Sequence, residues 1–153
     1  MAAGRLRSDW RWHTISRVSL SVRKLGNTLL PVICVGVGGF IGALMRYLTS
    51  LLMAGFSITI PYGTLISNGL GCFVIGIVAA LTTDTEVLSP NLRLFIATGI
   101  CGGFTTMSSF VYELAQYIRS DQQLMAAAYL GITLVASILM FYAGAALIAV
   151  ART

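Results

Sequence analysis

The sequence predicts an all-α membrane protein with four transmembrane helices. Of its 153 residues, 57% are hydrophobic and only 10% are charged, whereas a water-soluble domain carries about 25% charged residues. The apolar residues gather in four runs, at residues 31–53, 62–82, 92–118 and 124–150. Each run is long enough for the roughly 20 residues that a helix needs to cross a bilayer. Short connections separate the runs, so we expect one four-span domain over residues 29–153.

A basic tail, residues 1–28, precedes the first span and holds six of the ten Lys and Arg residues. Beside a membrane span, such charge is typical of a cytoplasmic segment attracted to anionic headgroups, and we expect no nucleic-acid partner. The tail fits a transit-like peptide, an interfacial segment or a product of an upstream start codon, so its place in the functional protein stays open. The Lys and Arg residues of the four spans alone give almost no orientation signal, so the tail would set the N-terminus inside.

The first span carries a small-residue pattern and one charge. Pro31 stands at its start, where a missing N–H does little harm. Gly38 and Gly42 are one helical turn apart, which predicts a close approach of two helix backbones. Arg46 lies near the end of the span, so it either anchors the helix at the interface or takes part in a pore.

Polar side chains repeat every four residues in the second and fourth spans, which places them on one helix face. In the second span, Thr64 and Asn68 follow this step, and the amide of Asn68 either bonds a neighbouring helix or faces a wet cavity. In the fourth span, Tyr129, Thr133 and Ser137 follow the same step. Their hydroxyls either bond back to the helix or form a polar track.

The third span has its weakest helix signal in its middle, in the segment "GGFTTMSSF" at residues 102–110. Paired glycines and threonines disfavour a helix, and Thr and Ser compete for backbone hydrogen bonds. We therefore expect the helix to break near Gly102–Thr105. Two interpretations remain: a kinked helix with glycine packing, or a break whose freed carbonyls bind a small hard cation.

These motifs resemble those of the Fluc/CrcB fluoride channels. The segment "GGFTTMSSF" is similar to their GG-x-TTFS-x-F signature, "YGTLISN" to the G-T-x-x-x-N of their second span, and "GGFIGALMRY" to their first span. The resemblance extends from about Val32 to the C-terminus and leaves out the basic tail. It implies an antiparallel dimer with two pores, made with a second copy of the chain or with a homologous subunit.

The resemblance also implies roles for individual residues. A sodium ion at the dimer centre would be held by the backbone carbonyls of Gly102 and Thr105, and Glu113 would lie near the pore end. The anion path would be lined by Thr64, Asn68, Met107, Phe110, Tyr129, Thr133 and Ser137. Met107 departs from the family pattern because it stands where a first phenylalanine is usual, and Phe141 stands where the hydroxyl track might continue.

The implied function is passive export of cytoplasmic fluoride across the cell inner (plasma) membrane, which reduces fluoride toxicity. Amide and hydroxyl donors and the electropositive edge of an aromatic ring suit a small anion. A small proton-coupled multidrug transporter and a non-transporting packing subunit are the alternatives. We expect no enzyme, because the spans carry no nucleophile–base pair and no metal-ligand cluster.

Overall fold

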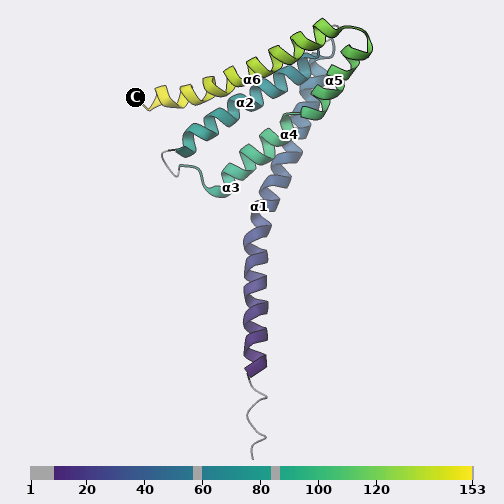
Figure 1. The fold of residues 1–153 in the computed structure, drawn as a ribbon. Helices are drawn as coiled ribbons and strands as arrows, with labels where there is room; N and C mark the ends of the chain where they lie inside the picture. The colour runs from purple at the N-terminus through teal and green to yellow at the C-terminus, as the bar shows by residue number, and fades with distance from the viewer. Residues whose placement is uncertain (1–8, 57–59, 84–86, 153) are drawn as a thin grey trace, which may run out of the picture.

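The computed structural model describes the backbone of residues 9–56, 60–83 and 87–152, and the side chains of residues 28–56, 60–82 and 87–152. Within these residues the chain is helical and contains no strand (Figure 1). The elements in order are α1 (Asp9–Met53), α2 (Tyr62–Thr83), α3 (Pro90–Arg93), η1 (Leu94–Cys101), α4 (Gly102–Phe104), α5 (Met107–Arg119) and α6 (Gln123–Ala151).

Four segments are long and apolar enough to cross a membrane, as the sequence predicts. They are Thr28–Met53, Tyr62–Thr82, Pro90–Arg119 and Gln123–Ala151. Large apolar side chains such as Phe40, Leu52 and Leu139 stay exposed on their outer faces. Such exposure is expected where the surrounding solvent is lipid, because hydrocarbon does not penalise apolar surface.

The first span continues a helix that begins well before it. α1 runs without interruption from Asp9 and has Pro31 inside it, so the expectation that Pro31 begins the first helix is wrong. A proline inside a helix frees the carbonyl four residues earlier. Here that carbonyl belongs to residue 27, near the N-terminal end of the first apolar run, and the helix continues through Pro31. The N-terminal half of α1 projects beyond the other helices (Figure 1), and residues 1–8 of the predicted tail lie outside the described residues.

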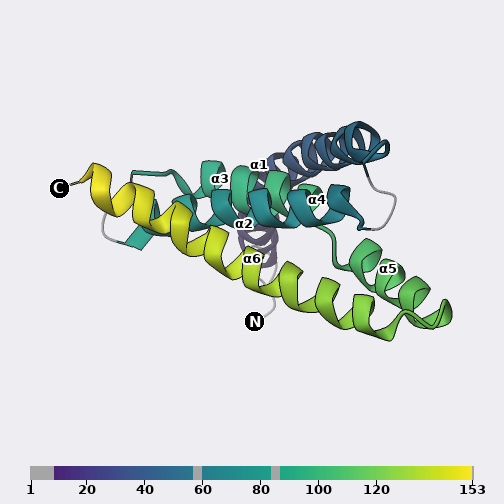
Figure 2. The ribbon, with the colours of Figure 1, turned by 90° about the horizontal axis from the view of Figure 1, so that it is seen from above.

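The third span is broken, which confirms the prediction from its sequence. Thr105 has φ −74° and ψ 156°, and Thr106 has φ −148° and ψ 118°, so two extended residues separate α4 from α5. The glycine pair lies on the helical side of this break, and Gly102 has the helical φ of −62° and ψ of −37°. Before the glycines, η1 has the wider π-helical hydrogen-bond pattern. Figure 2 shows α5 leaving the direction of α3 and α4 and running beside the start of α6.

Glycines set the close contacts between helices. A Cβ atom on Gly42 would overlap the carbonyl of Ile100, and one on Gly38 would lie 2.5 Å from the carbonyl oxygen of Phe95. α1 therefore packs directly on the backbone of the first half of the third span. α2 and α6 pack in the same way, because Cβ atoms on Gly76 and Gly144 would overlap backbone carbonyls of the facing helix.

Candidate functional site

The break in the third span is bridged by a side chain from α2. Asn68 Oδ1 accepts a hydrogen bond from the N–H of Thr106 at 2.7 Å, and Asn68 Nδ2 donates one to the Thr106 carbonyl at 3.2 Å. Asn68 therefore satisfies both backbone groups of one residue at the break. An amide nitrogen has two hydrogens, so one Asn68 N–H remains for another acceptor.

Side chains of the break residues satisfy further backbone groups. The Thr105 hydroxyl donates to the Cys101 carbonyl at 2.9 Å. The N–H of Ser109 donates to Thr106 Oγ1 at 3.1 Å, so Thr106 is the N-cap of α5. The Cys101 carbonyl also keeps its helical donor, the N–H of Thr105, at 2.9 Å. The sequence "TTMSS" therefore ends one helix with a second donor to its last bonded carbonyl and begins the next with a hydroxyl cap.

The bridge by Asn68 changes what the Gly102 carbonyl can do. In a continuous helix, the N–H of Thr106 would donate to the carbonyl of Gly102. That N–H donates to Asn68 instead, so the Gly102 carbonyl loses its helical donor. Gly102 is exposed, and a Cβ built on it meets nothing within 4 Å. The residue whose carbonyl loses this donor thus lies at an open surface of the third span.

A carboxylate accepts hydrogen bonds from two other predicted site residues. Thr64 donates to Glu113 Oε1 and Tyr129 donates to Glu113 Oε2, each at 2.7 Å. The ring of Phe110 is 5.2 Å from that of Tyr129, at a tilt of 54°. Phe110, Tyr129 and Thr64 are buried, and Glu113 is half-buried. α2, α5 and α6 thus meet in one polar and aromatic cluster: Thr64, Phe110, Glu113 and Tyr129.

This cluster changes the interpretation of two hydroxyls. Thr64 and Tyr129 each have a single O–H, and both point at Glu113. Neither hydroxyl can donate to a passing anion in this arrangement. The resemblance implies that Glu113 lies near the pore end, and its role as an acceptor between two helices could not be read from spacing along the chain.

Two buried hydroxyls have no hydrogen-bond partner among the described residues, Ser67 Oγ and Thr133 Oγ1. Their residues are 0% and 4% exposed, respectively. A buried hydroxyl without a partner costs free energy and is uncommon in folded proteins. Thr133 was singled out from the sequence and Ser67 was missed. Ser67 lies three residues after Thr64 and next to Asn68, and this position is the signal that could have identified it.

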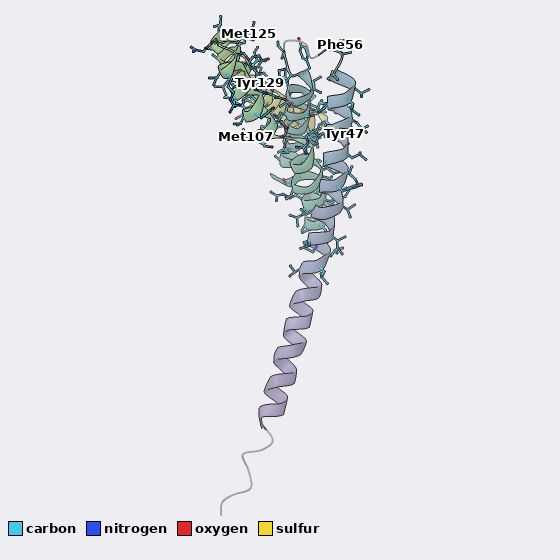
Figure 3. The ribbon with its side chains drawn as sticks, turned by 90° about the vertical axis from the view of Figure 1, so that its right-hand side faces the viewer. Tyr47, Phe56, Met107, Met125 and Tyr129 are labelled. Carbon is cyan, nitrogen blue, oxygen red and sulfur yellow. The ribbon has the colours of Figure 1, made fainter. Side chains whose placement is uncertain are left out.

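Other predicted site residues lie apart from the cluster. Met107 is 68% exposed at the start of α5, whereas Tyr129 on α6 is buried (Figure 3). Ser137 is half-buried on α6. Arg46 is half-buried on α1, and its carbonyl accepts a hydrogen bond from the Ser50 hydroxyl at 3.0 Å. Because Met107 is exposed and Phe110 is buried, the two side chains do not face a common space within one chain.

No group of three or more His, Cys, Asp or Glu side chains gathers in the described part of the chain. The two carbonyls that the resemblance implies for a cation belong to Gly102, whose carbonyl has lost its helical donor, and to Thr105, which is an extended residue. Neutral oxygens of this kind suit a hard cation.

Residues 33–145 match the family described as CrcB-like protein, Camphor Resistance (CrcB). A protein of Chlorobium chlorochromatii named fluoride-specific ion channel FluC is 42% identical over 113 residues, which cover 74% of this chain and 88% of the relative. A protein of the same name from Prosthecochloris aestuarii is 42% identical over 116 residues, 76% of this chain and 91% of the relative. One from Clostridium perfringens is 49% identical over 86 residues, 56% of this chain and 67% of the relative. The chain, with its four spans and its broken third span, therefore belongs to the CrcB-like family of multi-pass membrane proteins.

Proposed function

We propose that this chain forms a fluoride-selective channel that exports cytoplasmic fluoride passively across the plasma membrane and so reduces fluoride toxicity. The observation that carries the proposal is the break in the third span, held open by Asn68 through two hydrogen bonds to Thr106. Such a break inside a membrane is tolerated only where protein buries it or water reaches it. The names of the relatives supply the ion.

The anion path would follow the groups that still have donors to offer. The second N–H of Asn68 and the buried, unpartnered hydroxyls of Ser67 and Thr133 are available. The buried ring of Phe110 adds an electropositive edge. All these groups are neutral, so they replace part of the water around fluoride without holding the ion too tightly to leave. Ser137 would extend the path along α6, one helical turn beyond Thr133.

Glu113 would organise this path and would not itself bind the anion. It accepts from Thr64 and Tyr129, which fixes the Tyr129 ring against Phe110 at 5.2 Å. A carboxylate next to an anion path repels the ion. The two hydroxyl donors disperse part of the Glu113 charge and so lessen this repulsion.

The functional unit would be an antiparallel dimer, made with a second copy or with a homologous subunit, with a sodium ion at its centre. Gly102 and Thr105 would hold the ion through two carbonyls, which are fewer oxygens than a hard cation takes. A second chain at the exposed Gly102 would complete the set. When bound, sodium supplies positive potential that favours anions near the path. Met107, exposed in one chain, would lie at the same subunit contact.

The alternatives make different demands on the same residues. A proton-coupled multidrug transporter needs a titrating carboxylate inside the bundle, and half-buried Glu113 is a candidate. Drug uptake that depends on Glu113 would favour that function. A packing subunit needs only the glycine contacts, so Asn68→Ala and Phe110→Ala would leave cells as resistant to fluoride as before.

The direct test is ion release from liposomes that contain the purified chain. We expect fluoride release well above that of empty liposomes and no chloride release. Asn68→Leu should abolish the release, whereas Leu70→Ala, an exposed position on the same helix, should retain it. Equal fluoride release from liposomes with and without protein would refute the proposed function.

A further inference from the structure

The N-terminal part of α1 reaches well beyond the other helices. α1 begins at Asp9, whereas the first span begins at Thr28. Figure 1 and Figure 3 both show this part of the helix leaving the bundle and continuing alone. At the rise of an α-helix, residues 9–27 extend roughly 28 Å from the start of the span. The proposed channel gives this segment no role.

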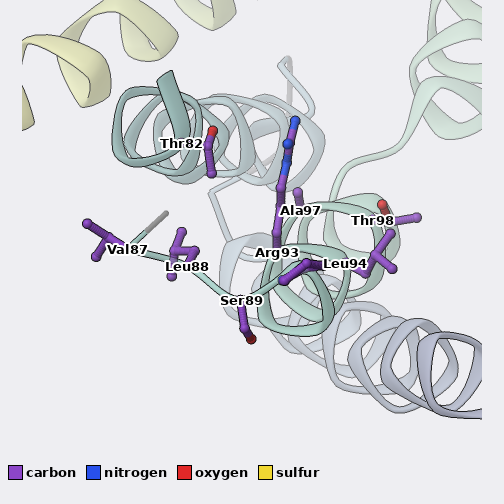
Figure 4. Close-up of a pocket in the computed structure, with 9 residues that line it drawn as sticks. Thr82, Val87, Leu88, Ser89, Arg93, Leu94, Ala97 and Thr98 are labelled. Carbon is purple, nitrogen blue, oxygen red and sulfur yellow. The ribbon is translucent and has the colours of Figure 1, made fainter. Parts of the chain in front are cut away.

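The segment leaves the bundle at the membrane boundary where the third span begins. The second span ends at Thr82 and the third begins at Pro90. Figure 4 shows this boundary, with Thr82 on α2 and Arg93 at the start of the third span. In a four-span chain, the starts of the first and third spans lie on the same side of the membrane. Residues 9–27 are therefore joined to the bundle at the level of the lipid headgroups.

The sequence of residues 9–27 is amphipathic on this helix. Four apolar residues follow one another at steps of three and four, so they share one face, called the apolar face below. They are Ile15, Val18, Val22 and Leu25. Trp10 and Trp12 lie before them, at the two borders of the apolar face. Tryptophan is enriched where hydrocarbon meets water, so the pattern is typical of a helix at a membrane surface.

Basic residues occupy the other side of the segment. Arg17, Arg23 and Lys24 lie off the apolar face by their register, and Arg11 stands one turn before Ile15, where that face ends. Residues 10–27 include no acidic residue. A surface that covers the apolar face must therefore offer hydrocarbon at its centre and negative charge at its edges.

Charge decides between the candidate occupants of this face. A second copy of the segment would bring two sets of basic residues together without acidic residues to pair them, and like charges repel. A bilayer with anionic headgroups combines hydrocarbon with negative charge. We propose that residues 9–27 lie along the surface of an anionic membrane, with the apolar face toward the acyl chains. This proposal does not depend on fluoride conduction.

The chain has a place to turn onto this surface. Pro31 has no N–H to donate to the carbonyl of residue 27, and Gly26 has low helix propensity. A turn at Gly26–Asn27 therefore gives up fewer hydrogen bonds than a turn elsewhere in the segment. A straight helix would carry Arg11 and Arg17 further from the headgroups than the roughly 10 Å over which charges act at ordinary salt.

Tryptophan fluorescence of the full-length protein in liposomes tests the proposal, because Trp10 and Trp12 are the two tryptophans of the chain. Liposomes of phosphatidylglycerol are compared with liposomes of phosphatidylcholine, each with brominated acyl chains that quench nearby indoles. In phosphatidylglycerol we expect emission at shorter wavelength and a larger loss of intensity. Each basic residue near an anionic surface favours binding about fivefold, so the combined change Arg17→Gln, Arg23→Gln and Lys24→Gln should lower the ratio of bound to free segment on the order of a hundredfold.

Two leucines provide a matched pair of variants. Leu25→Ser removes a residue of the apolar face, and Leu20→Ser makes the same change on the opposite side of the helix. Leu25→Ser should weaken surface binding about tenfold, because it removes one apolar side chain from contact with lipid. Leu20→Ser should leave the quenching unchanged.

Four results would overturn the proposal. One is an absence of quenching in phosphatidylglycerol, which would leave the segment as a projecting helix. Another is equal quenching in the two lipids, which would remove the recognition of charge. The third is an equal effect of Leu25→Ser and Leu20→Ser. The fourth is quenching that changes with the number of chains per liposome, which would assign the apolar face to a second copy.

Discussion

Replacement of Asn68 by leucine tests the central structural feature, because leucine keeps the size of the side chain and removes its amide. The amide bonds both the N–H and the carbonyl of Thr106. Each buried backbone group left without a partner costs about 1–3 kcal/mol. If both groups of Thr106 stay unpaired, the free energy of unfolding falls by roughly 2–6 kcal/mol. If the Thr106 N–H returns to the Gly102 carbonyl, one group stays unpaired and the cost is about 1–3 kcal/mol. We expect Asn68→Leu to lower the free energy of unfolding by about 2–4 kcal/mol.

The measurement is the free energy of unfolding in mixed detergent micelles, with Asn91→Leu as the control. Asn91 belongs to the short α3 and lies outside the break, so the same substitution there should change stability by less than about 0.5 kcal/mol. Fluoride release from liposomes is the second readout, and Asn68→Leu should abolish it through closure or collapse of the break. An Asn68→Leu protein as stable as the Asn91→Leu control would refute the reasoning that the amide holds the third span open.

Three further predictions use single positions. Gly42→Ala should destabilise the protein by more than about 1 kcal/mol, since its Cβ would lie 2.8 Å from the Phe104 nitrogen; Gly36→Ala, where a Cβ meets nothing within 4 Å, is the control. Thr133→Val should leave stability unchanged or slightly higher, because it removes a buried hydroxyl without a partner, yet it should reduce fluoride release; an unaltered rate would remove Thr133 from the path. Met107→Phe should keep or raise fluoride release in the liposome assay, since it restores an aromatic edge, and a clear loss would contradict this.

Local chemistry predicted the main elements of the fold. Continuous apolar runs longer than the bilayer is thick can only cross it as helices, so the four spans followed from length and hydropathy. The break followed from the low helix propensity of "GGFTT". The break lies at Thr105 and Thr106, after the glycine pair. It lies there because Asn68, on another helix, satisfies Thr106, which propensity along one segment cannot encode.

For the glycines and for Glu113 too, the local sequence predicts one part, and the packing of the helices decides the rest. A step of four residues indicated a packing face at Gly38 and Gly42, but the close contacts of Gly76 and Gly144 depend on which helices are neighbours. Glu113 looked like a residue at the end of a span, whereas it bonds Thr64, 49 residues away, and Tyr129, 16 residues away. Local sequence predicts a helix start at Pro31, whereas Pro31 lies inside α1.

The sequence by itself determined that this chain resides in a membrane, crosses it four times and interrupts its third crossing, because these outcomes depend on hydrophobicity and backbone preference within each segment. Only the tertiary structure decided where the interruption lies and which side-chain donors stay without a partner. Those properties depend on pairing between groups far apart in the chain, and a polar group inside a membrane can be satisfied only by the neighbour that folding brings to it.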